Sequence, residues 1–408
     1  MKKIIVIILF IFYVVTVLGE PDADWVTIRG NYERTAFIDV KINEVTPLDK
    51  VSLGDVLNGE TIIVKDSFLV TAKNHIYRFS PGKKEYVWRN GFSDKFLSMP
   101  TLHKGFLYVG GSDSKLYVVN VSTGKVVKRI DVLGPVVYSP IVKDDKTLLS
   151  LSNKWLYLFS IKDNKTLWFF HAKDFLSEPC LVNNTVYLVS GNKVYALDFM
   201  NGNLLWSYRM GGKSIVSPIY SDNHIYVASL DGNVYAIKVS DGKLSWMFNT
   251  SNGLTIPLAL DSQYIYVVSR DKIFQIEKGD GKLKGIVKGY GVIGSAPLIY
   301  ENAICFIAGL KLFIIDSKTY KEIFSTDLPL CGQSFISGGK NFIVVSNKKS
   351  LFIMKIQEKK PLQPHLIPVG SKVIFIISVV IALIILALII IIYRKQKYQK
   401  YSRYYQRY

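Results

Sequence analysis

Few residues of this 408-residue chain have the types and spacing that chemistry requires. The five histidines include no HxxxH pair, the spacing that places two metal ligands on one helix face. No CxxCH haem motif and no GxSxG nucleophile motif occur. The sequence therefore predicts no catalytic residue, no cofactor and no metal site. We interpret the histidines as surface or turn residues; they are His75, His103, His171, His224 and His365.

The three cysteines, Cys180, Cys305 and Cys331, are an odd number and cannot all pair within the chain. A Cys305–Cys331 disulfide is one interpretation. Buried free thiols at Cys180 and Cys305 are the other, because both lie in apolar runs. The sequence leaves both open.

The elements that would position any site come from an internal repeat. Prolines recur every 39 or 40 residues, and extending the rhythm one unit each way reaches Thr61 and Phe335. This gives eight units, whose prolines are Pro100, Pro140, Pro179, Pro218, Pro257 and Pro297. A period of this length indicates a repeat architecture.

Each unit contains four short apolar runs separated by turn residues, as in residues 217–250. Such runs predict a four-stranded antiparallel meander. The sequence thus predicts an all-β, eight-bladed β-propeller over residues 20–357. The eighth unit has room for three strands, so we expect residues 24–29, led by Trp25, to complete it. An open, gapped ring is the alternative.

Both ends of the chain carry membrane or targeting signals. Residues 1–19 have the charges, apolar run and small residues of a signal peptide, with an uncleaved anchor as the alternative. Residues 372–393 predict a transmembrane helix after a proline-rich stalk at 358–371. The basic, tyrosine-rich tail at 394–408 predicts a cytosolic C-terminus, with the propeller outside the cytosol.

The net charge of +19 is only a weak indication of an anionic partner, because a lysine-rich surface also serves solubility. The predicted orientation removes the chain from nucleic acid. We therefore expect no nucleic-acid partner, and the sequence predicts no oligomeric state.

The segments Tyr195-Ala-Leu-Asp-Phe-Met-Asn-Gly-Asn-Leu-Leu-Trp206 and Tyr235-Ala-Ile-Lys-Val-Ser-Asp-Gly-Lys-Leu-Ser-Trp246 resemble the repeat of pyrroloquinoline-quinone (PQQ) dehydrogenases. Residues 29–35 after Trp25 resemble the entry segment of that superfamily. The resemblance implies tryptophans that dock one blade against the next: Trp25, Trp88, Trp168, Trp206 and Trp246. Three units depart from it, with Lys128, Gly285 and Phe324 at the tryptophan position.

A working quinoprotein of this family is a longer chain with a vicinal cysteine pair and calcium ligands, and neither can be carried over to this sequence. The resemblance therefore favours a non-catalytic, single-pass membrane protein that binds a protein or peptide partner on a propeller face. Protein assembly or quality control along the secretory route fits the related non-catalytic branches. The alternatives are a quinone-dependent oxidoreductase and a glycan-binding cell-surface receptor.

Four candidate N-glycosylation sites occur at Asn120, Asn164, Asn183 and Asn249. The first three fall in turns that the fold places on one face, whereas Asn249 falls on the opposite face. Three glycans would crowd the first face. We therefore expect ligands to use the other one.

Overall fold

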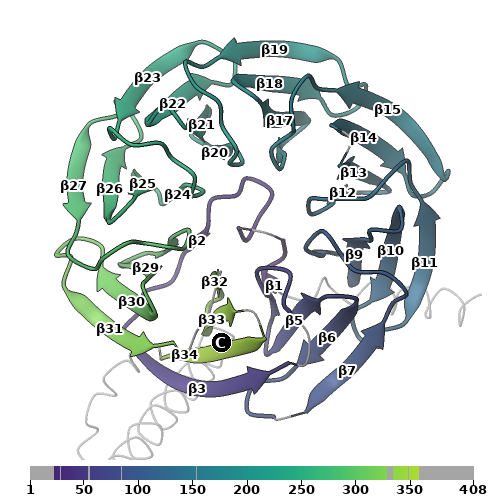
Figure 1. Cartoon of the computed structure of the whole chain (residues 1–408), viewed down its shortest axis with the longest axis horizontal. Coiled ribbons are helices and arrows are strands. Elements are labelled where there is room, and N and C mark those ends of the chain that lie inside the picture. The colour runs from purple at the N-terminus through teal and green to yellow at the C-terminus, as the bar shows by residue number, and fades with distance from the viewer. Residues whose placement is uncertain are drawn as a thin grey trace, which may run out of the picture. The chain divides into compact units, whose positions relative to one another are not determined.

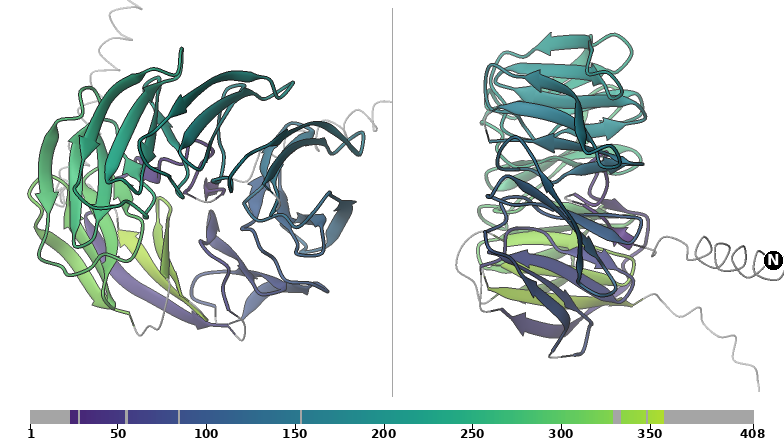
Figure 2. Two further views of the ribbon diagram at one scale, coloured as in Figure 1. Left: turned by 45° about the horizontal axis from the view of Figure 1, so that its top comes forward. Right: turned by 90° about the vertical axis from the view of Figure 1, so that its right-hand side faces the viewer.

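The computed structural model describes residues 23–27, 29–53, 56–83, 85–152, 154–328, 334–347 and 349–357. These residues form eight sheets around one axis (Figure 1). Seen edge-on, the ring is a disc whose strands run between its two faces (Figure 2). The predicted all-β, eight-bladed propeller is confirmed.

The predicted signal peptide, stalk, transmembrane helix and tail lie outside the described residues. Within the ranges that the structure covers, no helix has the length and hydropathy of a membrane span.

Each blade is numbered by sequence order and contains four strands from the axis to the rim. The first four blades are β4 (Ile62–Val64), β5 (Ser67–Ala72), β6 (His75–Phe79) and β7 (Tyr86–Gly91); β8 (Thr101–His103), β9 (Phe106–Gly110), β10 (Lys115–Asn120) and β11 (Val126–Asp131); β12 (Ile141–Lys143), β13 (Lys146–Ser150), β14 (Trp155–Ser160) and β15 (Lys165–His171); and β16 (Cys180–Val182), β17 (Thr185–Ser190), β18 (Lys193–Asp198) and β19 (Leu204–Arg209).

The last four blades follow the same plan. They are β20 (Ile219–Ser221), β21 (His224–Ala228), β22 (Asn233–Lys238) and β23 (Leu244–Asn249); β24 (Ala259–Leu260), β25 (Tyr264–Ser269), β26 (Lys272–Glu277) and β27 (Leu283–Val287); β28 (Leu298–Tyr300), β29 (Ala303–Ala308), β30 (Lys311–Asp316) and β31 (Glu322–Asp327); and β32 (Ser334–Gly338), β33 (Phe342–Asn347) and β34 (Ser350–Gln357) with β3 (Glu44–Ser52).

The N-terminal region closes the ring, but not through the strand that we predicted. The outer strand of blade 8 is β3, which pairs with β34 from Glu44↔Gln357 to Ser52↔Ser350. Residues 24–29 do not supply it: β1 (Ala23–Trp25) instead pairs with β4 on the axis side of blade 1. The nine-residue β3 matches the eight-residue β34 in length, which β1, with three residues, cannot do.

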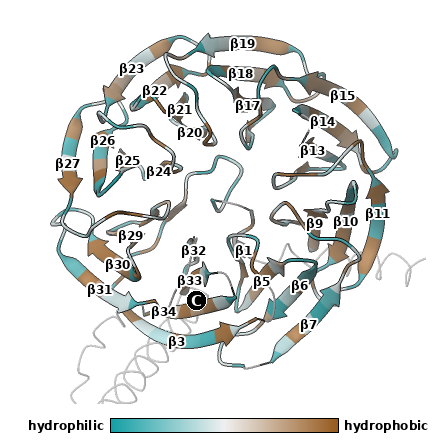
Figure 3. Cartoon of the chain, viewed as in Figure 1, coloured by the Kyte–Doolittle hydropathy of each residue, from teal (hydrophilic) through white to brown (hydrophobic). Residues whose placement is uncertain are grey.

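The middle strands supply most of the hydrophobic core. They are buried on both sides because blades stack face to face, whereas outer strands such as β7 and β19 contain only exposed and half-buried residues. Hydrophilic residues are interspersed along β7 (Figure 3). The repeat prolines immediately precede the first strand in most blades, for example Pro140 before β12, where a missing N–H is tolerated.

The two faces of the disc carry different parts of each blade. We call one the terminal face: it carries the turns between strands one and two and between strands three and four, and Gln357 lies at it. We call the other the connection face: it carries the turns between strands two and three and the connections between successive blades.

Candidate functional site

The axis of the ring is filled by the chain itself. An axial segment, residues 26–27 and 29–40, runs through the centre of the disc (Figure 1). Its backbone carbonyls accept hydrogen bonds from the innermost strands of blades 4, 5, 6 and 7. The bonds run from Leu181 N to Tyr32 O (3.2 Å), Tyr220 N to Glu33 O (3.1 Å), Leu260 N to Thr35 O (3.1 Å) and Ile299 N to Ala36 O (2.9 Å).

The second and third blades are held in the same way. Leu102 N donates to Val26 O at 2.8 Å. The Tyr32 hydroxyl donates to Val142 O at 3.0 Å and lies 3.2 Å from Val142 N. Strand β2 (Phe37–Ile38) then pairs in parallel with β28. The axial segment therefore satisfies backbone N–H groups that would otherwise face an open channel.

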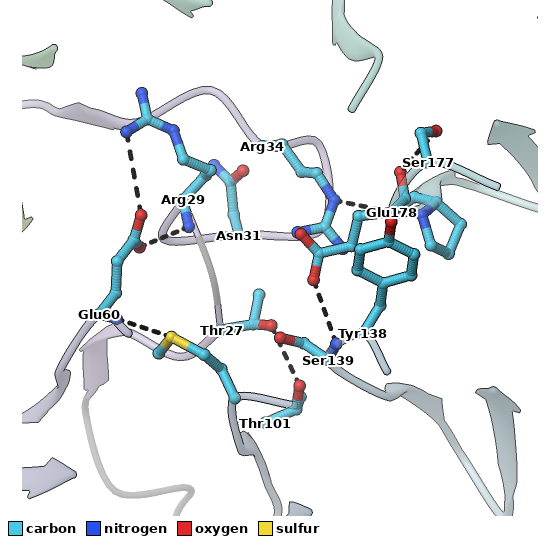
Figure 4. Close-up of polar contacts among 12 residues, drawn as sticks. Thr27, Arg29, Asn31, Arg34, Glu60, Thr101, Tyr138, Ser139, Ser177 and Glu178 are labelled. Carbon is cyan, nitrogen blue, oxygen red and sulfur yellow. Dashed lines mark hydrogen bonds and ion pairs between the residues drawn. The ribbon is translucent and has the colours of Figure 1, made fainter. Parts of the chain in front are cut away.

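Two buried arginines fix this segment to opposite sides of the ring (Figure 4). Arg29 Nη2 donates to Pro297 O (2.7 Å) and Leu258 O (3.3 Å), and its Nη1 lies 3.9 Å from Glu60 Oε1. Burial lowers the pKa of the Arg29 guanidinium, and Glu60 opposes that shift. The ion pair thus offsets part of the cost of burying the charge.

Arg34 makes a matching set of contacts. Its side chain is fully buried, Nε donates to Pro179 O at 2.7 Å, and Nη1 lies 3.5 Å from Glu178 Oε2. Glu178 Oε1 in turn accepts from Ser139 N at 3.1 Å. A buried charge that is paired and hydrogen-bonded can be retained in the fold, whereas an unpaired one is strongly destabilising.

The residues at the axis do not fit a quinone cofactor. A quinone bound there would have to displace the axial segment, and an acidic quinone would need free cationic groups. Both guanidinium groups already face a carboxylate and donate to backbone carbonyls. Among the described residues, no group of three or more His, Cys, Asp or Glu side chains has metal-binding geometry.

The four outer-strand tryptophans share one contact with the next blade. Each indole Nε1 donates to the backbone carbonyl that follows the third strand of that blade. The bonds are Trp88 to Val121 (2.8 Å), Trp168 to Phe199 (2.9 Å), Trp206 to Val239 (2.8 Å) and Trp246 to Lys278 (2.9 Å). Trp25 differs from them because it lies on β1 beside the axis, paired with Ile63, and not on an outer strand.

A glycine lies under each of these four rings. The glycines are Gly124, Gly202, Gly242 and Gly281, in the turn between strands three and four of the receiving blade. Each has φ between 70° and 75°, and an added Cβ would lie 2.6–2.7 Å from the ring atom Cδ2. The docking contact therefore requires a pair of residues, a tryptophan and the glycine of the following blade.

The three departing units solve the same contact differently. Lys128 Nζ donates to Ile161 O, the carbonyl equivalent to those that accept from the indoles. At the junction of blades 6 and 7 the pair is reversed: a Cβ on Gly285 would lie 2.0 Å from the Tyr320 hydroxyl, so the tyrosine fills the space. Phe324 packs against the core formed by blades 6 to 8 and 1.

The candidate glycosylation sites lie where their turns place them. Asn120, Asn164 and Asn183 are on the terminal face, and Asn249 ends β23 at the connection face. Asn164, Asn183 and Asn249 are exposed, whereas Asn120 is half-buried and accepts from Thr123 N at 3.0 Å. Their occupancy stays a prediction.

Cys180 and Cys305 are buried free thiols. Burial raises the pKa of the Cys180 thiol to about 12. Cys331, the partner in the alternative disulfide, lies outside the described residues.

The connection face carries an exposed apolar ring. Outside the strands of the described chain, nine large hydrophobic residues are exposed, and all but Met200 lie on this face. The eight residues of the ring are Val56, Leu97, Leu133, Phe175, Ile215, Leu230, Val292 and Leu310. Phe175 is 74% exposed and Val292 is 70% exposed. Single exposed hydrophobic residues are common, but their concentration on one face is typical of an interaction surface.

Backbone contacts hold several of these residues in place. The residues next to Val56, Leu97, Phe175 and Val292 form isolated bridges with a neighbouring hairpin: Leu57↔Ala72, Phe96↔Gly111, Leu176↔Ser190 and Ile293↔Ala308. The exposed side chains therefore project from fixed backbone positions, which lowers the entropy cost of binding.

A pocket of about 180 Å³ opens in this ring between blades 3, 4 and 5. Phe175, Ile215 and Leu230 form its apolar wall, and Tyr138 closes it by donating to Leu176 O at 2.9 Å. Burial, with a smaller effect from Glu178, raises the pKa of Tyr138, so this side is neutral. The pocket has the size of one or two apolar side chains and suits a protein partner better than a large cofactor.

Comparison with known proteins identifies the family. A family model described as "Outer membrane protein assembly factor BamB" matches residues 72–282 and 194–330, more than half of the chain. The chain belongs to this PQQ-like propeller family. Among solved structures, BamB from Moraxella catarrhalis superposes with a TM-score of 0.66 at 13% identity, covering 76% of this chain and all of that one.

Enzymes are also similar to the chain. A europium-containing methanol dehydrogenase gives a TM-score of 0.67 at 12% identity, over 84% of this chain and 99% of that one. The tetrathionate hydrolase of Acidithiobacillus ferrooxidans is 28% identical over 135 residues, 33% of this chain and a quarter of that enzyme's length. These likenesses show the fold and leave the activity open.

Within this BamB-type propeller, sequence reasoning missed the axial segment and the apolar ring. Arg29 and Arg34 lay in the segment noted for its family resemblance, but no pattern placed them at the axis. The ring residues occur at varied distances from the repeat prolines, so periodicity could not find them. The connections between blades did contain a usable signal: two neighbouring apolar residues, one of which is buried by pairing with a strand while the other is exposed.

Proposed function

We propose that this BamB-type propeller is a non-catalytic module that binds another protein through its connection face. The observation that carries the proposal is the distribution of exposed large hydrophobic residues outside the strands of the described chain: eight lie on the connection face, and Met200 alone lies on the terminal face. Exposed apolar clusters of this kind mark interaction surfaces.

The filled axis supports a binding role over a quinone-dependent one. The axial segment occupies the position that an axial cofactor would need, and its arginines are paired with Glu60 and Glu178. The family description, an outer membrane protein assembly factor, supports a role in assembling or handling other proteins.

The proposed orientation in the membrane rests on the sequence. Gln357, the last described residue, lies at the terminal face, so a stalk at 358–371 would leave from that face. The propeller would lie outside the cytosol. Three of the four sequons lie on the terminal face, so the connection face would carry the glycan of Asn249 alone.

The proposal is tested by co-purification of the full chain from membranes of its own host. A variant with Phe175→Ser and Ile215→Ser should lose the partner that the wild-type chain retains. Met200→Ser, which changes an equally apolar side chain on the other face, should retain it. Equal loss from both variants, or retention by the first, would refute the proposal.

A further inference from the structure

At the junction between blades 2 and 3, a lysine makes the hydrogen bond that a docked tryptophan makes elsewhere, but no indole ring is present. Lys128 Nζ donates to Ile161 O, as the four indoles do to their own carbonyls. A lysine stem occupies much less volume than an indole. The receiving turn also departs from the pattern, because Asn164, with φ 53°, stands where the four tryptophan junctions have glycine.

A pocket of about 190 Å³ lies at this junction. Phe159, Asn164 and Thr166 line it, and these are the positions that face the indole in an occupied junction. At the junction of blades 1 and 2, Trp88 packs with Val119 and Val126, the equivalents of Phe159 and Thr166. The pocket is therefore lined by the three receiving positions that an indole at position 128 would cover.

The junction between blades 6 and 7 also lacks the tryptophan, but the space there is filled. Tyr320 fills the contact at Gly285 from the opposite side, and its hydroxyl donates to Gln275 Oε1 at 2.5 Å. Loss of a tryptophan is therefore compensated within the chain there, but not between blades 2 and 3.

The lining of the pocket suits an aromatic group. Leu149, Leu151, Tyr157 and Phe159 form an apolar wall. Outside it, Phe169 is 62% exposed, and its ring lies 6.2 Å from that of Tyr157. Aromatic rings pack well at such separations, so the apolar surface continues from the pocket onto the rim.

The charge around the pocket is positive. Lys165 lines it and is exposed, and the turn of Asn164 also carries Lys162 and Asp163, so two lysines and one aspartate give this turn a net positive charge. Asp131, which also lines it, is paired with Lys115 at 3.2 Å. The pocket therefore favours an aromatic side chain that acidic residues flank.

We propose that the blade 2–3 junction receives an aromatic side chain from an acidic segment of a partner protein. The partner would supply from outside the ring that Trp88, Trp168, Trp206 and Trp246 supply from within the chain. This inference deepens the proposed function and rests on it for the identity of the partner as a protein. It also requires that Asn164 carries no glycan, because Asn164 and Thr166 of that sequon line the pocket.

The test uses 5-fluoroindole as the probe and the full chain in lipid nanodiscs, followed by ¹⁹F NMR line broadening. A double variant, Lys128→Trp with Asn164→Gly, should fill the pocket with the chain's own indole. The glycine is needed because a Cβ at the equivalent Gly124 would lie 2.6 Å from Trp88. Lys128→Met, which leaves the pocket open, is the matched control.

Probe affinity should fall at least about tenfold, or about 1.4 kcal/mol, in the double variant and remain in Lys128→Met. Thr166→Tyr, which fills the pocket from β15, should give the same loss and serves if the double variant does not fold. Partition of the probe into lipid is common to all variants and cancels. Equal broadening in the wild type and both filled variants would overturn the proposal.

The same measurement separates this inference from the proposed function. The Phe175→Ser, Ile215→Ser variant should still bind 5-fluoroindole, because neither residue lines this pocket. If that variant keeps its partner while the filled-pocket variants lose the probe, the connection-face proposal fails and the pocket stands. If the Phe175→Ser, Ile215→Ser variant loses its partner while the filled-pocket variants still bind the probe, the pocket proposal fails and the connection-face proposal stands.

Discussion

The docking of tryptophan on glycine can be measured with two matched glycine substitutions. Gly82 and Gly242 both lie in turns between strands three and four, with φ 72° and 70°. An added Cβ at Gly82 meets nothing within 4 Å, whereas at Gly242 it would lie 2.7 Å from Cδ2 of Trp206. Alanine therefore imposes the same backbone strain at both positions. Only at Gly242 does it also clash with the indole of Trp206.

The expected energies follow from these two terms. An alanine in the left-handed region costs about 1–2 kcal/mol, which is the whole expected loss for Gly82→Ala. Overpacking adds about 1–3 kcal/mol, so Gly242→Ala should cost about 2–5 kcal/mol. With Trp206→Leu in the background, the excess at Gly242 should fall close to zero, because the added methyl then has room.

Equilibrium urea unfolding followed by circular dichroism measures these differences without relying on indole fluorescence. The reasoning would be refuted if Gly82→Ala and Gly242→Ala lost the same free energy of unfolding. It would also be refuted if the excess at Gly242 survived the removal of Trp206.

Three further outcomes are expected. Arg34→Met should lower the free energy of unfolding by about 3–5 kcal/mol, because it leaves Glu178 buried without its cation, and adding Glu178→Gln should recover part of the loss in urea unfolding. Hydrogen bonding from Lys278 at 2.6 Å lowers the pKa of Asp222 below its usual 3.8, so its contribution to stability is present above that pH and is lost as pH falls through the lowered pKa. Asp222→Asn should therefore lower Tm at neutral pH and converge on the wild type in acid; a constant difference across that range would count against the ion pair. Iodoacetamide at neutral pH should label Cys180 only after unfolding, as read by peptide mass spectrometry, because burial raises the pKa of its thiol to about 12; rapid labelling of the native chain would contradict this.

The ring of eight blades could be predicted because each blade repeats the same local sequence pattern. Pro140, Pro179 and their equivalents mark the strand nearest the axis, and the tyrosines at Tyr195 and Tyr235 mark the third strand. These signals are local in the sequence and recur every blade. Their period therefore gives both the strand order and the number of blades.

The closing strand and the axial segment could not be predicted in the same way, because neither repeats. Residues 44–52 contain Pro47, which an outer strand tolerates because a missing N–H can face solvent there, and the structure places a bulge between Pro47 and Asp49. The course of Arg29 and Arg34 through the axis depends on carbonyls from blades that lie far away in the sequence.

The open junction had a signal that went unused. Lys128 was noted as a departure from the tryptophan pattern, but the following turn was not compared with it. Each outer-strand tryptophan predicts a glycine in the next blade, and Asn164 breaks that rule together with Lys128. Reading the two positions as a pair would have located the pocket from sequence.

The most direct test of the binding role is photocrosslinking from a single position on each face. A benzoylphenylalanine at Ile215, on the connection face, and one at Met200, on the terminal face, start from side chains that are 62% and 51% exposed. In the full chain within its own host, the account predicts a discrete protein adduct from position 215 that Phe175→Ser abolishes, and none from position 200. Adducts of equal yield from both positions, or from position 200 alone, would contradict it.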